Sequence, residues 1–177
     1  MMNQHLDRKI YYFEEQRFRH KWLWIVLLLS TLFITIFFAY GTVQQIMLGQ
    51  PCGNRPMSNT ALIITGSISI ALMGGITYLF YTLKLITEVS NDSMHIRFFP
   101  ISQQIIPFNN IKKCEVRQYS PIMEYGGWGI RYGRKGKAYN VSGNRGVQLE
   151  LFQGKPLLIG SQRPDELAQA INSLLKR

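Results

Sequence analysis

The sequence contains few of the side chains on which metal binding and covalent catalysis usually depend. Its histidines and cysteines are few and scattered: His5, His20, His95, Cys52 and Cys114. No Cys-x-x-Cys pair and no histidine pair at ligand spacing is present, so we do not expect a metal site or a disulfide framework. We therefore predict that the chain has no catalytic residues, no metal ion and no cofactor.

Two further patterns that could support chemistry are also incomplete. Glu14 and Glu15 are adjacent, but neighbouring residues do not share one helical face, so an acid–base pair is not expected there. A phosphate-binding loop needs glycines, a lysine and Ser or Thr at fixed spacing before a helix. Gly136-Lys137 is instead followed by Ala138 and residues typical of a strand. Nucleotide binding is therefore not expected.

Charge is absent from two long stretches, residues 22–40 and 61–83. A bilayer core needs about 20 helical residues, and inside lipid every backbone amide must be bonded within its own segment. We therefore predict a two-helix transmembrane hairpin over residues 22–83. Neither stretch contains an ionisable residue, which argues against a proton relay or an ion pathway.

The basic residues around these spans predict the orientation of the hairpin. Only Arg55 lies in the connection between the spans. Five basic residues precede the first span: Arg8, Lys9, Arg17, Arg19 and Lys21. Lys84 follows the second span directly. Because basic residues accumulate on the cytoplasmic side, we predict a multi-pass protein of the cell membrane with both termini cytoplasmic. Cys52 and Cys114 then lie on opposite sides and do not pair.

Small residues recur at intervals of four in both spans, which predicts close packing between helices in lipid. They are Thr31, Thr35 and Ala39 in the first span, and Ser67, Ala71 and Gly75 in the second. The connection between the spans is too short to be a domain. We expect the first helix to extend through Val43 to Met47, and Ser58 or Asn59 to cap the second helix.

The amino-terminal arm, residues 1–21, has two readings. Tyr11, Phe18 and Trp22 recur at near-helical spacing, which favours an amphipathic helix at the membrane interface. The β-favouring run Tyr11-Tyr12-Phe13 makes a short strand that joins the cytoplasmic sheet the alternative.

Residues 84–177 change to the alternating pattern of strands. Leu83, Leu85, Thr87 and Val89 lie on one face with Lys84 and Glu88 opposite, and Asn91-Asp92 then predicts a tight turn. Further alternation predicts about six or seven short antiparallel strands in a cytoplasmic domain. A carboxyl-terminal amphipathic helix begins at Pro164, with an apolar stripe: Leu167, Ile171, Leu174 and Leu175.

Strands followed by one carboxyl-terminal helix resemble the pleckstrin-homology-like (PH-like) fold. The segments Glu124–Arg131, Ala138–Leu151 and Leu157–Ile171, together with Phe13–Phe18 before the two spans, resemble small uncharacterised bacterial membrane proteins with two transmembrane helices and a PH-like domain. This resemblance implies an antiparallel β-barrel or sandwich and a membrane location. It does not imply a reaction.

The most conspicuous candidate binding region surrounds a glycine-rich loop. Trp128 lies among Gly126, Gly127 and Gly129, and either packs into the fold or presents itself to a partner. A basic group follows, which is either a solvated face or a contact for anionic lipid: Arg131, Arg134, Lys135, Lys137 and Arg145. No regular aromatic spacing accompanies these residues, so nucleic-acid binding is not expected.

Together these patterns predict an integral, non-enzymatic membrane protein. Its PH-like domain is expected to bind a protein partner or to self-assemble at the inner membrane face. The alternative is recognition of anionic headgroups through the basic 131–145 region.

Overall fold

The computed structural model describes residues 9–51, 53, 55–133 and 135–176. Cys52 and Arg134, which carried predictions about thiol location and lipid contact, lie outside these residues. The chain forms two compact units. One is helical, Arg19–Thr82, and the other combines the chain up to Phe18 with the chain from Leu83 onward. The helical unit is therefore inserted into a β-rich unit. The β-rich domain expected over residues 84–177 does not include the strand Tyr12–Arg17, which belongs to the same compact unit.

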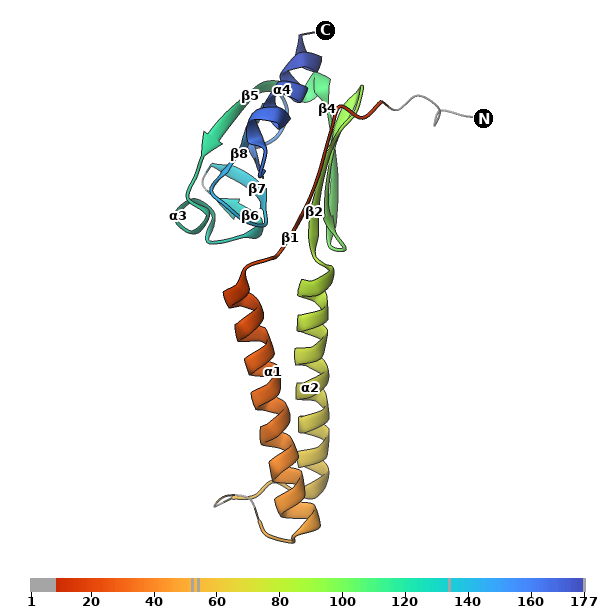
Figure 1. Cartoon of the computed structure of the whole chain (residues 1–177), viewed down its shortest axis with the longest axis vertical. Helices are drawn as coiled ribbons and strands as arrows, with labels where there is room; N and C mark the ends of the chain where they lie inside the picture. The colour runs from red at the N-terminus through yellow and green to blue at the C-terminus, as the bar shows by residue number, and fades with distance from the viewer. Residues whose placement is uncertain (1–8, 52, 54, 134, 177) are drawn as a thin grey trace, which may run out of the picture. The chain divides into compact units, whose positions relative to one another are not determined.

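The helical unit contains two antiparallel helices that lie side by side (Figure 1). Helix α1 (Lys21–Thr42) continues as the π-helical turn η1 (Val43–Met47), and α2 spans Asn59–Thr82. Both are long and apolar enough to cross a membrane. The expected extension through Met47 is confirmed. The expected cap is also confirmed, because Ser58 Oγ accepts a hydrogen bond from the Ala61 amide at 3.2 Å.

The two helices approach most closely where small residues meet large ones. Leu62 and Gly66 of α2 are buried, and a Cβ atom added at Gly66 would lie 2.9 Å from the Phe38 ring. Further along the pair, the hydroxyl oxygens of Thr31 and Thr77 lie 3.4 Å apart. The contact therefore depends on the absence of a side chain at Gly66.

The small residues singled out in the sequence are divided by this packing. Thr31 and Thr35 are half-buried, and Thr35, Ala39 and Ser67 line a groove between the helices. Ala71 and Gly75 are exposed, and a Cβ atom at Gly75 would have no neighbour within 4 Å. The expected stripe Ser67–Ala71–Gly75 thus differs from the observed contact, because the close approach occurs at Gly66, one position earlier.

The β-rich unit begins with a four-stranded antiparallel sheet of order β1-β2-β3-β4. Its strands are β1 (Tyr12–Arg17), β2 (Lys84–Val89), β3 (Ser93–Phe99) and β4 (Ser102–Pro107). The outermost partners of the first pair are Arg17 with Lys84 and Tyr12 with Val89. The strands that flank the inserted helices therefore pair with each other along their full length.

The second sheet has five strands in the order β5-β8-β9-β7-β6. They are β5 (Ile111–Gln118), β6 (Gly129–Gly133), β7 (Gly136–Asn140), β8 (Arg145–Leu151) and β9 (Leu157–Gly160). The β7–β9 pair is parallel, and the other pairs are antiparallel. Two short 3₁₀ and α-helical turns precede and follow β5: η2 (Phe108–Asn110) and α3 (Pro121–Tyr125).

Helix α4 (Pro164–Leu175) packs on the second sheet with the predicted apolar stripe inward. Leu167, Ile171 and Leu174 are buried, as expected, against a core formed mainly by the central strands. Val147, Leu149 and Ile159 of β8 and β9 have no exposed surface. The predicted helix start at Pro164 is confirmed.

Several expectations for this unit need correction. The amino-terminal arm does not form the favoured amphipathic helix. Its alternating burial makes it strand β1, the alternative reading. In the described part of residues 84–177 there are eight strands, β2 to β9, rather than six or seven, and one pair of them is parallel. In those residues the strands form two sheets, not a closed barrel.

The sequence of the arm favours a helix although the arm forms a strand, because the strand with which it pairs, β2, lies far along the chain. The Tyr11, Phe18 and Trp22 spacing straddles two elements, since β1 ends at Arg17 and α1 begins at Lys21. Within β1, Tyr12, Glu14 and Gln16 are buried and Phe13 and Glu15 are exposed. Two of the three inward residues are polar, so an apolar alternation did not reveal the strand.

The substitution Gly66→Leu should separate the two helices, because the Cβ atom of the new side chain would clash with the ring of Phe38. Overpacking of this kind costs about 1–3 kcal/mol. Cysteines placed at Thr31 and Thr77 should form a disulfide in the parent chain, and Gly66→Leu should lower that yield. Gly75→Leu is the matched control and should leave the yield unchanged. Equal losses for both variants would contradict the observed packing.

Candidate functional site

The glycine-rich loop positions Trp128 and Arg131 against the fold. The glycines on either side of Trp128 have φ angles of 126° (Gly127) and 117° (Gly129), which favour residues without a side chain. The half-buried Trp128 donates from Nε1 to the Gly143 carbonyl at 3.3 Å. Arg131 donates from Nε to the Trp128 carbonyl at 2.9 Å. Both residues therefore hold the loop, although Arg131 stays exposed.

Lys135 belongs to an ion cluster centred on Glu124 of α3. The Glu124 carboxylate pairs with Lys135 at 3.3 Å and with Arg117, and it accepts a hydrogen bond from the Ser120 amide at 2.9 Å. Partial burial alone would raise the pKa of Glu124, but these three donors outweigh it and hold the pKa below its usual range. The charge of Lys135 is therefore partly neutralised.

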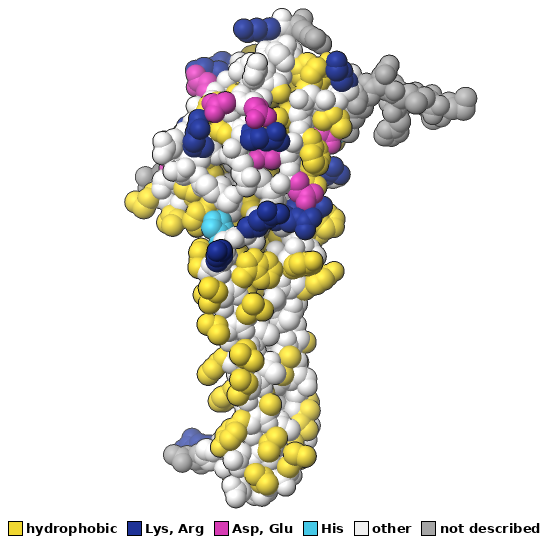
Figure 2. Space-filling view, viewed as in Figure 1, with side chains coloured by type: hydrophobic (Ala, Val, Ile, Leu, Met, Phe, Trp, Pro, Cys, Tyr) yellow, Lys and Arg dark blue, Asp and Glu magenta, His cyan; other side chains and the backbone are white. Residues whose placement is uncertain are grey.

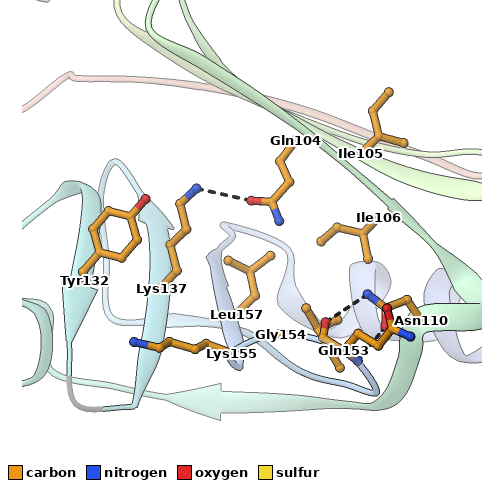
Figure 3. Close-up of a pocket in the computed structure, with 11 residues that line it drawn as sticks. Gln104, Ile105, Ile106, Asn110, Tyr132, Lys137, Gln153, Gly154, Lys155 and Leu157 are labelled. Carbon is orange, nitrogen blue, oxygen red and sulfur yellow. Dashed lines mark hydrogen bonds between the residues drawn. The ribbon is translucent and has the colours of Figure 1, made fainter.

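Lys137 turns inward, toward a cavity of about 250 Å³ between β4 and the second sheet (Figure 3). Its Nζ donates to Gln104 Oε1 at 3.3 Å and to the Tyr139 hydroxyl. Burial alone would lower the pKa of Lys137, but the bond with Tyr139 and the nearby Tyr132 outweigh this and raise it. Lys137 is thus a half-buried positive charge on strand β7 that lines this cavity.

The cavity has both polar and apolar lining residues. Lys137, Lys155 and Tyr132 supply the polar groups, and Ile106, Leu151 and Leu157 supply apolar wall. Among the described residues that line it there is no carboxylate. No group of three His, Cys, Asp or Glu side chains in the described chain could hold a metal ion.

Arg145 lies apart from the other basic candidates. It begins β8, and its guanidinium pairs with Asp165 in the first turn of α4 at 3.2 Å. The basic group of the sequence is therefore dispersed: Arg131 holds a loop, Lys135 pairs with Glu124, Lys137 enters a cavity and Arg145 pairs with Asp165. Each of these four residues therefore has a partner within the fold, and headgroup binding by the 131–145 region stays a prediction.

An exposed apolar surface on α3 and β6 was missed in the sequence. It consists of Ile122, Met123 and Tyr132, which are 62%, 86% and 75% exposed, and we call it the α3–β6 surface. A local signal for α3 was present: Ser120 caps the helix, Pro121 follows, and Glu124 returns a bond to the Ser120 amide. Ile122 and Met123 of α3 are exposed while Pro121 and Tyr125 are buried, so a search for buried apolar residues would not reveal this surface.

A buried polar cluster ties β1 to the end of β9. Glu14 accepts hydrogen bonds from the Tyr12 hydroxyl at 2.6 Å, from Ser161 Oγ at 2.7 Å and from the Gln162 amide at 2.8 Å. Gln16 adds a bond to the Gly160 carbonyl at 2.8 Å. Burial, followed by the bond to Glu14, raises the pKa of Tyr12. The side chains of Tyr12, Glu14 and Ser161 are hydrogen-bonded to one another, so the cluster joins β1 of the first sheet to the residues that follow β9 of the second.

Glu14→Ala should weaken the β-rich unit, because it leaves buried hydroxyls of Tyr12 and Ser161 without their acceptor. The expected loss is about 1–3 kcal/mol of unfolding free energy. Glu15→Ala is the matched control: Glu15 lies on the outer face and makes exposed ion pairs with Arg17 and Lys84, each worth about 0–1 kcal/mol. Chemical denaturation of the purified full chain measures both. Equal effects would contradict the structural role of Glu14.

Comparison with known proteins gives a family but no further relative. The model of DUF6141, a family of unknown function, matches residues 9–176. No curated protein and no solved structure matches the chain. The matched range runs from the segment before β1 to the end of α4, and so covers both compact units. The chain therefore belongs to the DUF6141 family.

Proposed function

We propose that this chain is a non-enzymatic, membrane-anchored module whose β-rich unit docks a protein partner, or a second copy of itself, at the inner membrane face. The observation that carries this proposal is the α3–β6 surface, where Met123 is 86% exposed beside Ile122 and Tyr132. The absence of a catalytic pattern in the sequence directs us to binding rather than to a reaction.

The helical unit supports the anchoring part of the proposal. Figure 2 shows hydrophobic side chains along the drawn face of both helices. Phe33 of α1 and Leu72 of α2 are 70% and 62% exposed. Hydroxyl groups within the helices are satisfied by their own backbones: Thr31 and Thr77 donate to carbonyls four residues earlier, at 2.8 and 2.9 Å. Such a surface is stable in lipid and costly in water.

The distribution of basic residues supports both termini being cytoplasmic. Arg19 and Lys21 precede or begin α1, and Lys84 follows α2, whereas the connection contains only Arg55. A PH-like relationship is a further part of the proposal. It is supported by antiparallel strands in two sheets followed by a single carboxyl-terminal helix.

The α3–β6 surface has the composition of a docking site. Methionine and aromatic residues are enriched in protein interfaces, and Met adapts its shape to different partners. Met123 and Tyr132 also border an open cavity whose other lining residues include Glu124 and Lys135. An apolar centre with a charged edge is the usual arrangement of such sites.

Recognition of anionic headgroups through the 131–145 region has less support. Lys135 and Arg145 pair with Glu124 and Asp165, and Lys137 enters the cavity between the sheets. An anionic membrane would have to compete with these pairs.

A photo-crosslinking residue placed at Met123 of the full chain, in its native membrane, tests the docking proposal. We expect one discrete adduct, because a specific partner covers this surface. Two differently tagged copies distinguish a second copy of the chain from another protein. With the crosslinker at Tyr132, Met123→Glu should reduce the adduct about tenfold or more, as expected when a central apolar contact is lost.

The matched control carries the crosslinker at Glu115, an exposed residue of β5 outside the surface. It should give no discrete adduct. The docking proposal fails if Met123 gives none, or if Glu115 gives the same product.

A further inference from the structure

The turn between β3 and β4 lies beside the point where α2 becomes β2. Helix α2 ends at Thr82, β2 begins at Lys84, and Leu83 alone separates them. Lys84 is the register partner of Phe99, the last residue of β3. The turn that follows Phe99 is therefore adjacent to the first residue of β2, two residues beyond the end of α2.

This proximity does not depend on how the two units are oriented. Two Cα–Cα steps span at most about 7.6 Å, and antiparallel partners lie about 5 Å apart. The Cα atom of Phe99 is thus within about 13 Å of that of Thr82. Helix α2 has 24 residues and so a length of about 36 Å, slightly more than a hydrocarbon core of about 30 Å. If α2 spans the membrane as proposed, its end lies in the headgroup layer.

The residues of this turn are apolar and exposed. Phe99 and Ile101 flank Pro100 and are 52% and 59% exposed, whereas the neighbouring Phe98 is buried. The Ile101 amide closes the turn by donating to the Phe98 carbonyl at 2.8 Å. The turn at the other end of the same strand is polar: Asn91-Asp92 joins β2 to β3. The apolar turn is thus at the end of the sheet that continues into α2.

Positive charge surrounds the same end of the sheet. Lys84 lies with its Nζ 5.9 Å from the centre of the Phe99 ring, and its partner in β1 is Arg17. Lys84 and Arg17 share a single carboxylate, Glu15, which leaves one positive charge uncompensated. Arg19 and Lys21, which follow β1, are exposed.

We propose that the β3–β4 turn, Phe99–Ile101, inserts into the headgroup layer of the membrane that holds α1 and α2, an inference that rests on the proposed membrane anchoring. Phe99 and Ile101 enter the interface between headgroups and acyl chains, where amphipathic elements bury their apolar side chains. The cations at this end of the sheet attract anionic headgroups. The membrane contact thereby limits how the β-rich unit can turn about its two connections.

Depth-dependent fluorescence quenching tests this contact. The full chain carries Cys52→Ser and a cysteine introduced at position 101 (Ile101→Cys). This cysteine is labelled with an environment-sensitive dye, and the protein is reconstituted into vesicles of zwitterionic and anionic phospholipid. Cys114 is buried, and burial, followed by the charge of Glu115, raises the pKa of its thiol to about 12. It should therefore stay unlabelled in the folded protein. Nitroxide lipids quench the dye where it contacts the bilayer.

The matched control is Asp92→Cys at the opposite end of the same sheet, and the anchoring control is Leu32→Cys on the exposed face of α1. Shallow nitroxides should quench the dye at position 101 several-fold more than the dye at position 92. Phe99→Asp should reduce the difference, because its charge opposes insertion. Deep nitroxides should quench position 32.

Two outcomes distinguish failure of the turn insertion from failure of the membrane anchoring. Quenching at position 32 with equal, weak quenching at positions 101 and 92 would overturn the turn insertion and leave the anchoring intact. Absence of quenching at position 32 would overturn the anchoring and the turn insertion together.

Discussion

The pairing of β1 with β2 is the interaction on which the rest of the structure depends. These strands are separated in sequence by the whole helical unit, and they pair from Tyr12–Val89 to Arg17–Lys84. The antiparallel α1 and α2 return the chain to the side from which it left, so a long insertion costs little beyond ordinary loop closure. Glu14 and Gln16 then bind β1 to the end of β9, so β1 contacts both sheets. Strand β1 therefore connects to the helical unit through α1 and contacts both sheets of the β-rich unit.

This arrangement gives different surfaces different roles in the proposed function. The β3–β4 turn lies beside the first residue of β2, close to where the chain leaves α2, and we propose that it contacts the membrane. The α3–β6 surface belongs to α3 and the second sheet, and we propose that it contacts a partner. The basic residues that appeared to form one cluster in the sequence are instead used locally, as Lys135 with Glu124 and Arg145 with Asp165 illustrate. Charge counted along a sequence does not show which charges are already neutralised by neighbours.

Local patterns were sufficient to predict about half of this fold. The uncharged stretches predicted both helices, strict alternation predicted β2, β3 and β8, and Pro164 predicted the start of α4. Elements whose evidence lies elsewhere in the chain were missed. Strand β1 buries Glu14 and Gln16, which only the distant Ser161 and Gly160 satisfy, and β6 is a short strand rich in glycine. At the candidate site, Trp128 and Arg131 were recognised, but Met123 was not, because exposure of an apolar residue is a property of the folded surface.

The most direct test of this account is whether the β-rich unit folds without its helices. A chain in which Asn-Gly joins Phe18 to Leu83 replaces the helical unit with a two-residue hairpin turn, and residues 84–177 alone provide the comparison. Thermal unfolding followed by circular dichroism should show a cooperative transition for the joined chain and a much less stable or unfolded state for the shorter one. Equal stability of the two chains would show that β1 is dispensable and would contradict the account.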